Sequence, residues 1–319
     1  MVVVLGTGGT IAGTSTDASD NVGYTAGQLA AAALIQAIPA LAAVPLLVEQ
    51  VAQVDSKDMS HALWALLARR CAHHLALPEV AGIVITHGTD TLEETAWFLQ
   101  RVLAPAKPIV LTAAMRPATA LLSDGPQNLV DAVAVARTPG ASGVVAVLSG
   151  TIHSARDVRK LHSYRVDAFS SGDAGPLGVV EEGAVRMFRT WPAADAVGAG
   201  AGVGVGALNV DTASWPRVEI VMSHAGATGA VVQALHASGV HGIVVAATGN
   251  GTVHQDLEAA LTDAQRAGVP VLRSTRCASG RVLAGEGAAL PSADDLTPVK
   301  ARVELMLRLM AARPQSSPA

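Results

Sequence analysis

Several kinds of residue are scarce in this chain of 319 residues, and each scarcity argues against a class of protein. Cysteine occurs only as Cys71 and Cys277, outside any C-x-x-C or metal-ligand spacing, which argues against a disulfide framework and a metal site. Charged residues make up 15% and the net charge is −4, so no basic field exists for nucleic acid. No apolar run reaches the roughly 20 residues of a membrane span.

The first residues lack the charged segment, apolar segment and cleavage site of a secretory leader. Two unpaired thiols are typical of a reducing compartment. We therefore predict a cytoplasmic protein, and a periplasmic location stays open if a leader was removed. A hydrophobic content of 50% predicts a sizeable core.

Apolar runs of strand length alternate with segments of helical periodicity. Strands are predicted at residues 2–5, 46–54, 82–86, 108–113 and 143–149. Helices are predicted between them, at 28–37, 59–75, 92–103 and 125–137, and residues 91–94 (Thr-Leu-Glu-Glu) fit a capping box. This alternation predicts an α/β domain with a mostly parallel sheet flanked by helices.

The alternation is interrupted near Trp191, where residues 198–207 consist almost only of glycine, alanine and valine. We interpret residues 191–216 as a linker, with an additional strand of small residues as the alternative. A larger N-terminal catalytic domain (1–190) then precedes a smaller C-terminal α/β domain (217–319). Its strands are predicted at 218–222, 242–246 and 269–273, and its helices at 229–237, 255–267 and 297–312.

Two threonines stand where a nucleophile would be expected. Thr10 follows the first apolar run through a glycine-rich turn, and Thr89 follows the run that ends at Thr86. In open parallel sheets, ligands bind outside the carboxyl ends of the strands. Both threonines are therefore candidates for one crevice.

The glycine-rich turn fails both phosphate-binding templates. The sixth position of G-x-G-x-x-G is Ile11, and Thr14 stands where a P-loop requires lysine. This argues against a nucleotide-binding α/β protein, the alternative from a different class. The glycines instead let a substrate approach Thr10, and the polar segment 14–21 has the composition of a mobile lid.

A threonine hydroxyl needs a group that takes its proton. Tyr24, one of two tyrosines, is the candidate for Thr10. Lys160, one of four lysines among 22 basic residues, is the candidate for Thr89, since arginine does not deprotonate. Asp90 is either a helix cap or the partner of a substrate ammonium.

At this point the chain resembles the bacterial-type L-asparaginases, which include glutaminase-asparaginases. The resemblance covers almost the whole length. It rests on TGGTIAG at 7–13, ITHGTDTLEET at 85–95, AMRP at 114–117, SDGP at 123–126 and GNG at 249–251.

The resemblance implies amide hydrolysis without a cofactor. Thr10 would attack the side-chain amide of L-asparagine, with Tyr24 as its partner, and an aspartyl ester would then be hydrolysed. Thr89, Asp90 and Lys160 resemble the family's second catalytic set, and the order of attack by the two threonines stays open. The implied substrate-binding residues are Gly9, Ser56, Lys57, Gly88, Thr89, Asp90, Ala114, Asn250 and Glu286.

Within that set, Ser56 and Asp90 would hold the substrate carboxylate and ammonium, and backbone N–H groups near Thr89 and Ala114 would face the oxyanion. The family also implies a homotetramer of close dimers, in which Asn250 reaches a neighbour's site. Glu286 is the best match for a carboxylate that supports Tyr24 from the neighbour.

Lys57 departs from the family, whose members often carry glutamine there. Its ammonium could grip the substrate carboxylate and favour asparagine over glutamine. The leading interpretation is an asparaginase, and a broader glutaminase-asparaginase is the alternative. A transamidation subunit that feeds ammonia to a misacylated tRNA carries an extra N-terminal domain, whereas this chain starts at its first strand.

Overall fold

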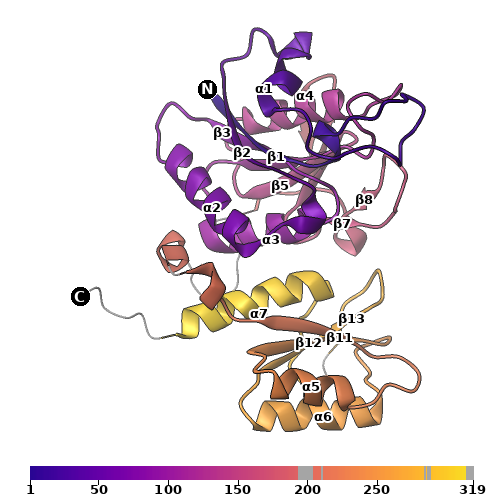
Figure 1. The fold of residues 1–319 in the computed structure, drawn as a ribbon. Helices are drawn as coiled ribbons and strands as arrows, with labels where there is room; N and C mark the ends of the chain where they lie inside the picture. The colour runs from indigo at the N-terminus through magenta and orange to yellow at the C-terminus, as the bar shows by residue number, and fades with distance from the viewer. Residues whose placement is uncertain (193–203, 210, 284, 286–288, 314–319) are drawn as a thin grey trace. The chain divides into compact units, whose positions relative to one another are not determined.

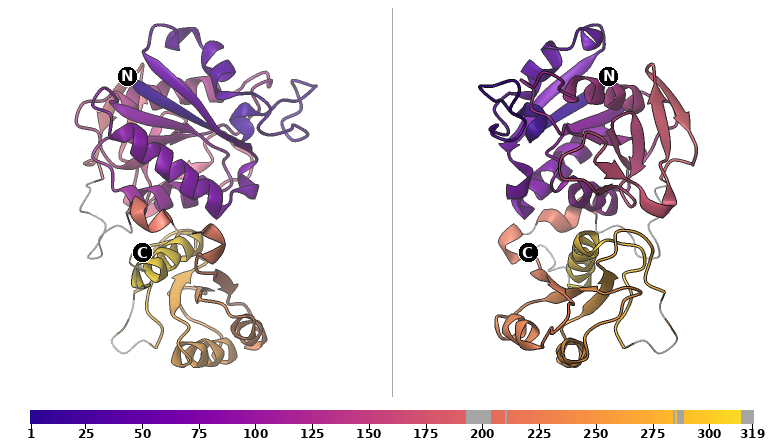
Figure 2. Two further views of the ribbon diagram at one scale, coloured as in Figure 1. Left: turned by 60° about the vertical axis from the view of Figure 1, so that its left-hand side comes forward. Right: turned by 90° about the vertical axis from the view of Figure 1, so that its right-hand side faces the viewer.

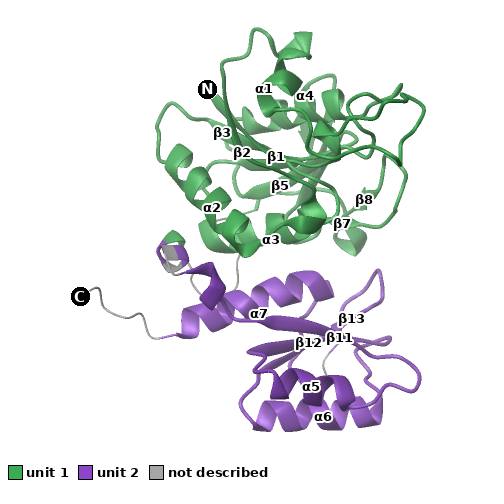
Figure 3. Cartoon of the chain, viewed as in Figure 1, with its two compact units in different colours: residues 1–205 green, residues 206–319 purple. Residues whose placement is uncertain are grey.

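The computed structural model describes residues 1–192, 204–209, 211–283, 285 and 289–313. The chain divides into two compact units, Met1–Val205 and Gly206–Ala319 (Figure 3). The predicted linker includes residues 193–203 and 210, which lie outside the described residues, so its limits stay a prediction. Its described part contains two short 3₁₀ helices, η5 (Val205–Asn209) and η6 (Thr212–Ser214).

The first unit is built on an eight-stranded sheet. Five strands are parallel, in the order β2-β1-β3-β4-β5, which confirms the predicted mostly parallel sheet. Their bounds are β1 (Val2–Gly8), β2 (Leu46–Val54), β3 (Gly82–Thr86), β4 (Ile109–Thr112) and β5 (Val144–Leu148).

Beyond β5 the sheet is antiparallel, an extension that the sequence analysis did not predict. β6, β9 and β10 follow in that order, and the hairpin of β7 and β8 forms a separate small sheet. The bounds are β6 (Thr151–Ser154), β7 (Arg159–Lys160), β8 (Phe169–Ser170), β9 (Gly178–Glu181) and β10 (Ala184–Met187).

The strand order reverses between β1 and β3. From β1 the chain goes to β2 on one side, and the later strands β3, β4 and β5 continue on the other. Such a switch point opens a crevice at the carboxyl ends of the two strands, where doubly wound sheets bind ligands. Thr10 and Thr89 follow the two strands that flank it.

Helices cover both faces of this sheet (Figure 1, Figure 2). One face carries α1 and α4, the other α2 and α3. Because both faces are covered, β1, β3, β4 and β5 are continuous buried apolar runs rather than alternating ones. The bounds are α1 (Ala31–Gln36), α2 (His61–Leu75), α3 (Leu92–Leu103) and α4 (Gly125–Ala136).

Helix α1 is shorter than predicted. The N–H groups of Gln28 and Leu29 donate to the carbonyl of Ala12, so the chain before Ala31 is bound to the turn after β1 instead of continuing the helix. Hydrogen bonds outside the segment thus outweigh its local helical periodicity.

The second unit is a smaller α/β unit, as predicted. Its three parallel strands pack between α5 and α6 on one face and α7 on the other (Figure 1). The bounds are β11 (Val218–Met222), β12 (Gly242–Ala247), β13 (Val271–Thr275), α5 (Ala230–Ala237), α6 (Gln255–Arg266) and α7 (Pro298–Ala312). No helix among the described residues is long and apolar enough to cross a membrane.

Candidate active site

Both threonines at the switch point are buried and paired with the predicted groups. Thr10, on the 3₁₀ turn after β1, has its Oγ1 2.6 Å from the Oη of Tyr24. Thr89 accepts a hydrogen bond of 2.8 Å from Lys160 Nζ, which also donates to Asp90 Oδ1 at 2.6 Å. Thr10 and Thr89 are only 7% and 6% exposed. Each hydroxyl therefore lies against a side chain that could exchange a proton with it.

Two glycines let the loops after β1 and β3 touch. Gly9 has φ of +81°, and a Cβ built on it would lie 2.4 Å from the N and Cα of Gly88. A Cβ on Gly88 would lie 2.4 Å from the Oγ of Ser56. The loops after β1, β2 and β3 are therefore in contact at a spacing that no side chain larger than hydrogen allows.

Ser56 ties the loop after β2 to the start of α3. Its hydroxyl accepts from the Asp90 N–H at 3.1 Å, and its carbonyl accepts from the Thr91 hydroxyl at 2.8 Å. The predicted capping box is therefore wrong, because Thr91 is the N-cap residue of α3 but makes no side-chain cap bond. Its hydroxyl holds Ser56 instead, and the Asp90 carboxylate meets Lys160.

The segment that carries Tyr24 is a closed loop. Thr14 and Thr25 exchange two backbone hydrogen bonds at its neck, of 3.0 and 2.9 Å. Further out, the Ala18 carbonyl accepts from the Leu121 N–H at 3.1 Å. Tyr24 is thus held beside Thr10, while the predicted lid motion stays a prediction.

Ala114 lies in the loop after β4 and is fully buried. A Cβ on Gly125, the first residue of α4, would lie 2.9 Å from Ile11 Cγ1 and 3.5 Å from Ala114 Cβ, so the start of α4 packs against both this loop and the turn that carries Thr10. Ala114 therefore belongs to the same strand-end cluster as the two threonines.

The Lys57 ammonium already has two partners in this structure. It lies 2.8 Å from Asp55 Oδ2 and 3.1 Å from Asp58 Oδ2, and its side chain is 62% exposed. The hydrogen bond with Asp55, followed by that with Asp58, raises the pKa of Lys57. A substrate carboxylate would have to compete with both aspartates for this cation.

The two residues predicted to act in a neighbouring copy are placed differently. Asn250, on the loop after β12, exchanges hydrogen bonds with the backbone of Leu283: the Leu283 N–H donates to Oδ1 at 2.8 Å and Nδ2 donates to the Leu283 carbonyl at 3.3 Å. Glu286 lies outside the described residues. Cys71 and Cys277 are both free, as expected.

A buried hydrogen-bonded chain next to Gly88 escaped the sequence analysis. Trp64 Nε1 donates to Thr95 Oγ1 at 2.9 Å, Thr95 lies 3.0 Å from His87 Nε2, and His87 Nδ1 lies 2.7 Å from the Gly88 carbonyl. A carbonyl only accepts, so Nδ1 carries the proton and Nε2 accepts from Thr95. The chain orients the Gly88 carbonyl, and only the spacing of His87 and Thr95 within the motif could have indicated it.

We expect His87 to make the protein acid-sensitive. Burial lowers the pKa of His87 from 6.5 to about 4, opposed by its hydrogen bond to Gly88. Between these values the unfolded chain binds a proton that the folded chain does not, so stability falls as the pH drops from 6.5 towards 4. Thermal unfolding at pH 7.5 and 4.5 should show a smaller pH effect for His87→Gln than for the control His236→Gln. Equal effects would contradict this.

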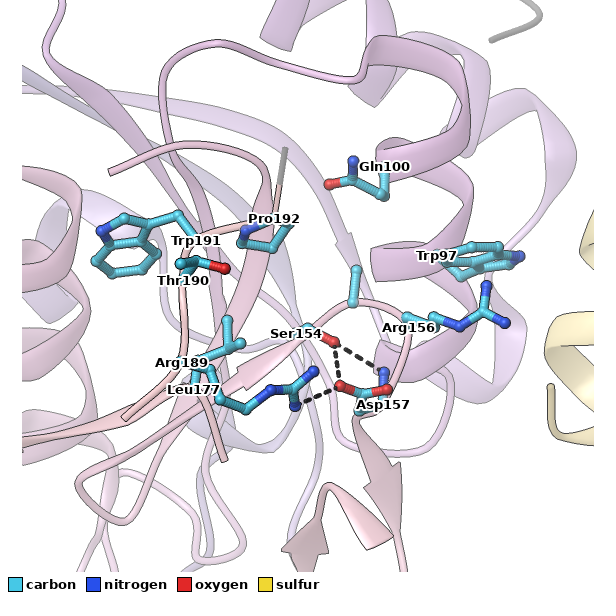
Figure 4. Close-up of a pocket in the computed structure, with 11 residues that line it drawn as sticks. Trp97, Gln100, Ser154, Arg156, Asp157, Leu177, Arg189, Thr190, Trp191 and Pro192 are labelled. Carbon is cyan, nitrogen blue, oxygen red and sulfur yellow. Dashed lines mark hydrogen bonds and ion pairs between the residues drawn. The ribbon is translucent and has the colours of Figure 1, made fainter. Parts of the chain in front are cut away.

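A cavity of about 260 Å³ lies elsewhere in the first unit (Figure 4). The Asp157 carboxylate there accepts from Ser154 at 2.8 Å and Arg189 at 3.0 Å, while Arg156 lies over the Trp97 ring. It shares no lining residue with the threonine pairs, and its central carboxylate is already paired within the protein.

The first unit has a doubly wound sheet with two paired hydroxyls at its switch point. This arrangement is typical of α/β enzymes that use a side-chain nucleophile. Residues 1–193 match the family described as "Asparaginase, N-terminal", and residues 217–316 match "Glutaminase/Asparaginase C-terminal domain". The chain belongs to the asparaginase family, which confirms the resemblance seen in its motifs.

Relatives match over nearly the full length. The chain is 38% identical over 320 residues to the glutaminase-asparaginase of Pseudomonas fluorescens biotype A, covering 97% of this chain and 86% of that protein. It is 35% identical to L-asparaginase 2 of Escherichia coli, covering 97% and 88%. The crystal structure of the probable cytoplasmic L-asparaginase from Campylobacter jejuni matches with a TM-score of 0.89 at 39% identity, covering 97% and 94%.

Proposed function

We propose that this protein hydrolyses L-asparagine to L-aspartate and ammonia, with Thr10 as the nucleophile. The observation that carries the proposal is the pairing of two buried hydroxyls, Thr10 with Tyr24 and Thr89 with Lys160, at one switch point. Relatives named L-asparaginase and glutaminase-asparaginase support the substrate class.

In the first half-reaction, the Tyr24 hydroxyl relays the Thr10 proton while Oγ1 attacks the amide carbon. The C–N bond breaks, the proton passes to the departing nitrogen, and ammonia leaves an aspartyl ester on Thr10. Backbone N–H groups of Thr89 and Ala114 face the oxyanion in this scheme.

In the second half-reaction, water attacks the ester, aspartate leaves and Thr10 regains its proton. Lys160 and Thr89 assist the attacking water, with Asp90 holding the lysine ammonium. Ser56 and Asp90 bind the α-carboxylate and α-ammonium, and Gly9 and Gly88 leave room for the substrate. No cofactor takes part.

The test is ammonia release by purified protein from asparagine, glutamine and a panel of nucleotides. We expect turnover of asparagine, slower turnover of glutamine and none of the nucleotides. Equal turnover of both amides would favour the glutaminase-asparaginase alternative. Activity towards nucleotides alone would contradict the proposal.

We propose that Lys57 contributes to the preference for asparagine by holding the α-carboxylate at one distance from Thr10. Lys57→Gln should raise KM for asparagine and narrow the ratio of kcat/KM for asparagine to that for glutamine. The effect of the substitution should stay below about tenfold. When substrate binds, Lys57 gains one charge-assisted bond to the α-carboxylate but loses its two ion pairs with Asp55 and Asp58. The measurement is kcat and KM of both proteins for asparagine and glutamine. If both the KM for asparagine and the ratio of the two kcat/KM values are unchanged, Lys57 has no role in substrate selection.

We also propose a homo-oligomer, a tetramer of close dimers, in which Asn250 of one copy completes the site of another. Five exposed apolar side chains support this, because they lie on the segments that carry Tyr24, Ala114 and Lys160. They are Val22, Leu121, Leu122, Leu161 and Tyr164.

We expect sedimentation at assay concentration to show at least a dimer. Leu122, 87% exposed, is the best position for a disrupting charge. Leu122→Glu should shift the population to monomers and lower activity together, whereas the control Val231→Glu on α5 should not. Fully active monomers would contradict the proposal.

We propose that the protein is cytoplasmic. Its two free thiols and the likeness to a probable cytoplasmic L-asparaginase support this location. Another relative, from Haemophilus influenzae, is named a probable periplasmic L-asparaginase, so cell fractionation is the direct test.

A further inference from the structure

The acidic residue at the start of α4 does not cap its own helix. Asp124 is the N-cap residue, a position where aspartate ordinarily accepts from N–H groups of the first turn. Pro126 removes one of those donors, and Asp124 makes no cap bond. Its Oδ2 instead accepts from the Met115 N–H and its Oδ1 from the Arg116 N–H, both at 2.9 Å.

Asn128, one turn further along α4, holds the other side of the same loop. It is 2% exposed. Its Nδ2 donates to the Ala113 carbonyl at 2.9 Å and to Asp124 Oδ2 at 3.3 Å, while its Oδ1 accepts from the Ser149 N–H at 2.9 Å. One amide therefore joins the end of β4, the start of α4 and the turn after β5.

These bonds determine the direction of both peptide groups that flank Ala114. In a planar trans peptide the C=O and N–H point in opposite directions. Because the Ala113 carbonyl points to Asn128, the Ala114 N–H points away from it. Because the Met115 N–H points to Asp124, the Ala114 carbonyl points away from that carboxylate.

The backbone of Ala114 itself is left without a partner. Among the described residues, neither its N–H nor its carbonyl makes a hydrogen bond, although the residue is fully buried. Buried backbone groups are nearly always paired in native proteins, so the N–H and the carbonyl of Ala114 are both available to bind a substrate. A primary amide, with one acceptor and two donors, suits this donor and acceptor pair.

We propose that Asp124 and Asn128 are positioning residues: they hold the Ala113–Met115 backbone so that Ala114 presents its N–H and carbonyl to the reacting amide of the substrate. This rests on the proposed function. Neither side chain touches the substrate. They act by orienting the Ala114 backbone in advance, so that it needs no rearrangement during the reaction.

Asp124→Asn and Asn128→Ala test this, with Asp131→Asn as the matched control. Asp131 lies on the same helix, is 3% exposed and bonds to Gln127 rather than to the loop. A misplacement of about 1 Å can cost about 10²-fold, so we expect kcat for asparagine to fall 10- to 100-fold in the first two variants. KM should change less than about threefold, since Ser56 and Asp90 still hold the α-groups.

Calorimetric titration with L-aspartate counts the folded sites, so that kcat is expressed per intact site. Asp131→Asn should keep kcat within about twofold of the unaltered protein. If Asp124→Asn does not fold, the same measurements on Asn128→Ala provide the test. Normal kcat per aspartate-binding site in a folded variant would overturn the positioning role. An unaltered protein that releases no ammonia from asparagine would overturn the proposed function, and this inference with it.

Discussion

Thr10→Ala and Thr89→Val are each expected to lower kcat/KM for asparagine by roughly 10³-fold or more, with the fold intact. Each change removes one hydroxyl from a buried pair, the first facing Tyr24 and the second facing Lys160. Loss of a nucleophile, or of the group that assists water, removes a step for which the site offers no substitute. Steady-state kinetics and thermal unfolding of the same preparations provide the measurement.

Two controls separate chemistry from structure. Thr10→Ser keeps a hydroxyl beside Tyr24 and should retain more activity than Thr10→Ala. Thr138→Val removes a hydroxyl whose one hydrogen bond within the described residues goes to a helix carbonyl, that of Ala134, and it should leave turnover unchanged. Near-normal turnover in either Thr10→Ala or Thr89→Val would make that threonine structural and refute its proposed role.

Gly9→Ala should abolish measurable activity and destabilise the first unit. The new Cβ would lie 2.4 Å from the Gly88 backbone, and backbone cannot move aside as a flexible side chain can. Gly140 has a similar φ, +76°, but has nothing within 4 Å of a Cβ. Gly140→Ala should therefore show only the strain of a left-handed alanine, about 1–2 kcal/mol, with full activity.

Denaturant unfolding and ammonia release, measured on both alanine variants, make the comparison. The difference between them isolates the close approach of the two loops from the backbone strain they share. If Gly9→Ala is as stable and active as Gly140→Ala, the loops after β1 and β3 do not touch as described.

The sequence predicted the components of the site better than their assembly. Buried strands read as continuous apolar runs, so the ends of β1 and β3, and with them Thr10 and Thr89, were visible from local pattern alone. Strand order was not, because pairing of β1 with both β2 and β3 depends on contacts between residues far apart in sequence. The switch point could only be recognised once that order was known.

Helix-capping rules assign the wrong partners to two polar side chains of this protein. Thr91 and Asp124 both stand at helix starts, and a capping rule assigns their side chains to their own helices. In the structure each binds the backbone of another loop, at Ser56 and at Met115–Arg116. The role of Lys57 in binding the substrate carboxylate stays a prediction, and its ion pairs with Asp55 and Asp58 were not predicted. The distant partners of Thr91 and Asp124 leave no periodic pattern in the sequence.

The position of β1 between β2 and β3 has a consequence for how the protein acquires activity. Strand β1 cannot complete its pairing until residues 46–54 and 82–86, which follow it in the chain, have also been made. Strands that pair across a long stretch of sequence fold slowly, because the entropy of loop closure is lost before the stabilising contacts between the strands form. Regain of enzymatic turnover during refolding should therefore lag behind the recovery of helical circular dichroism.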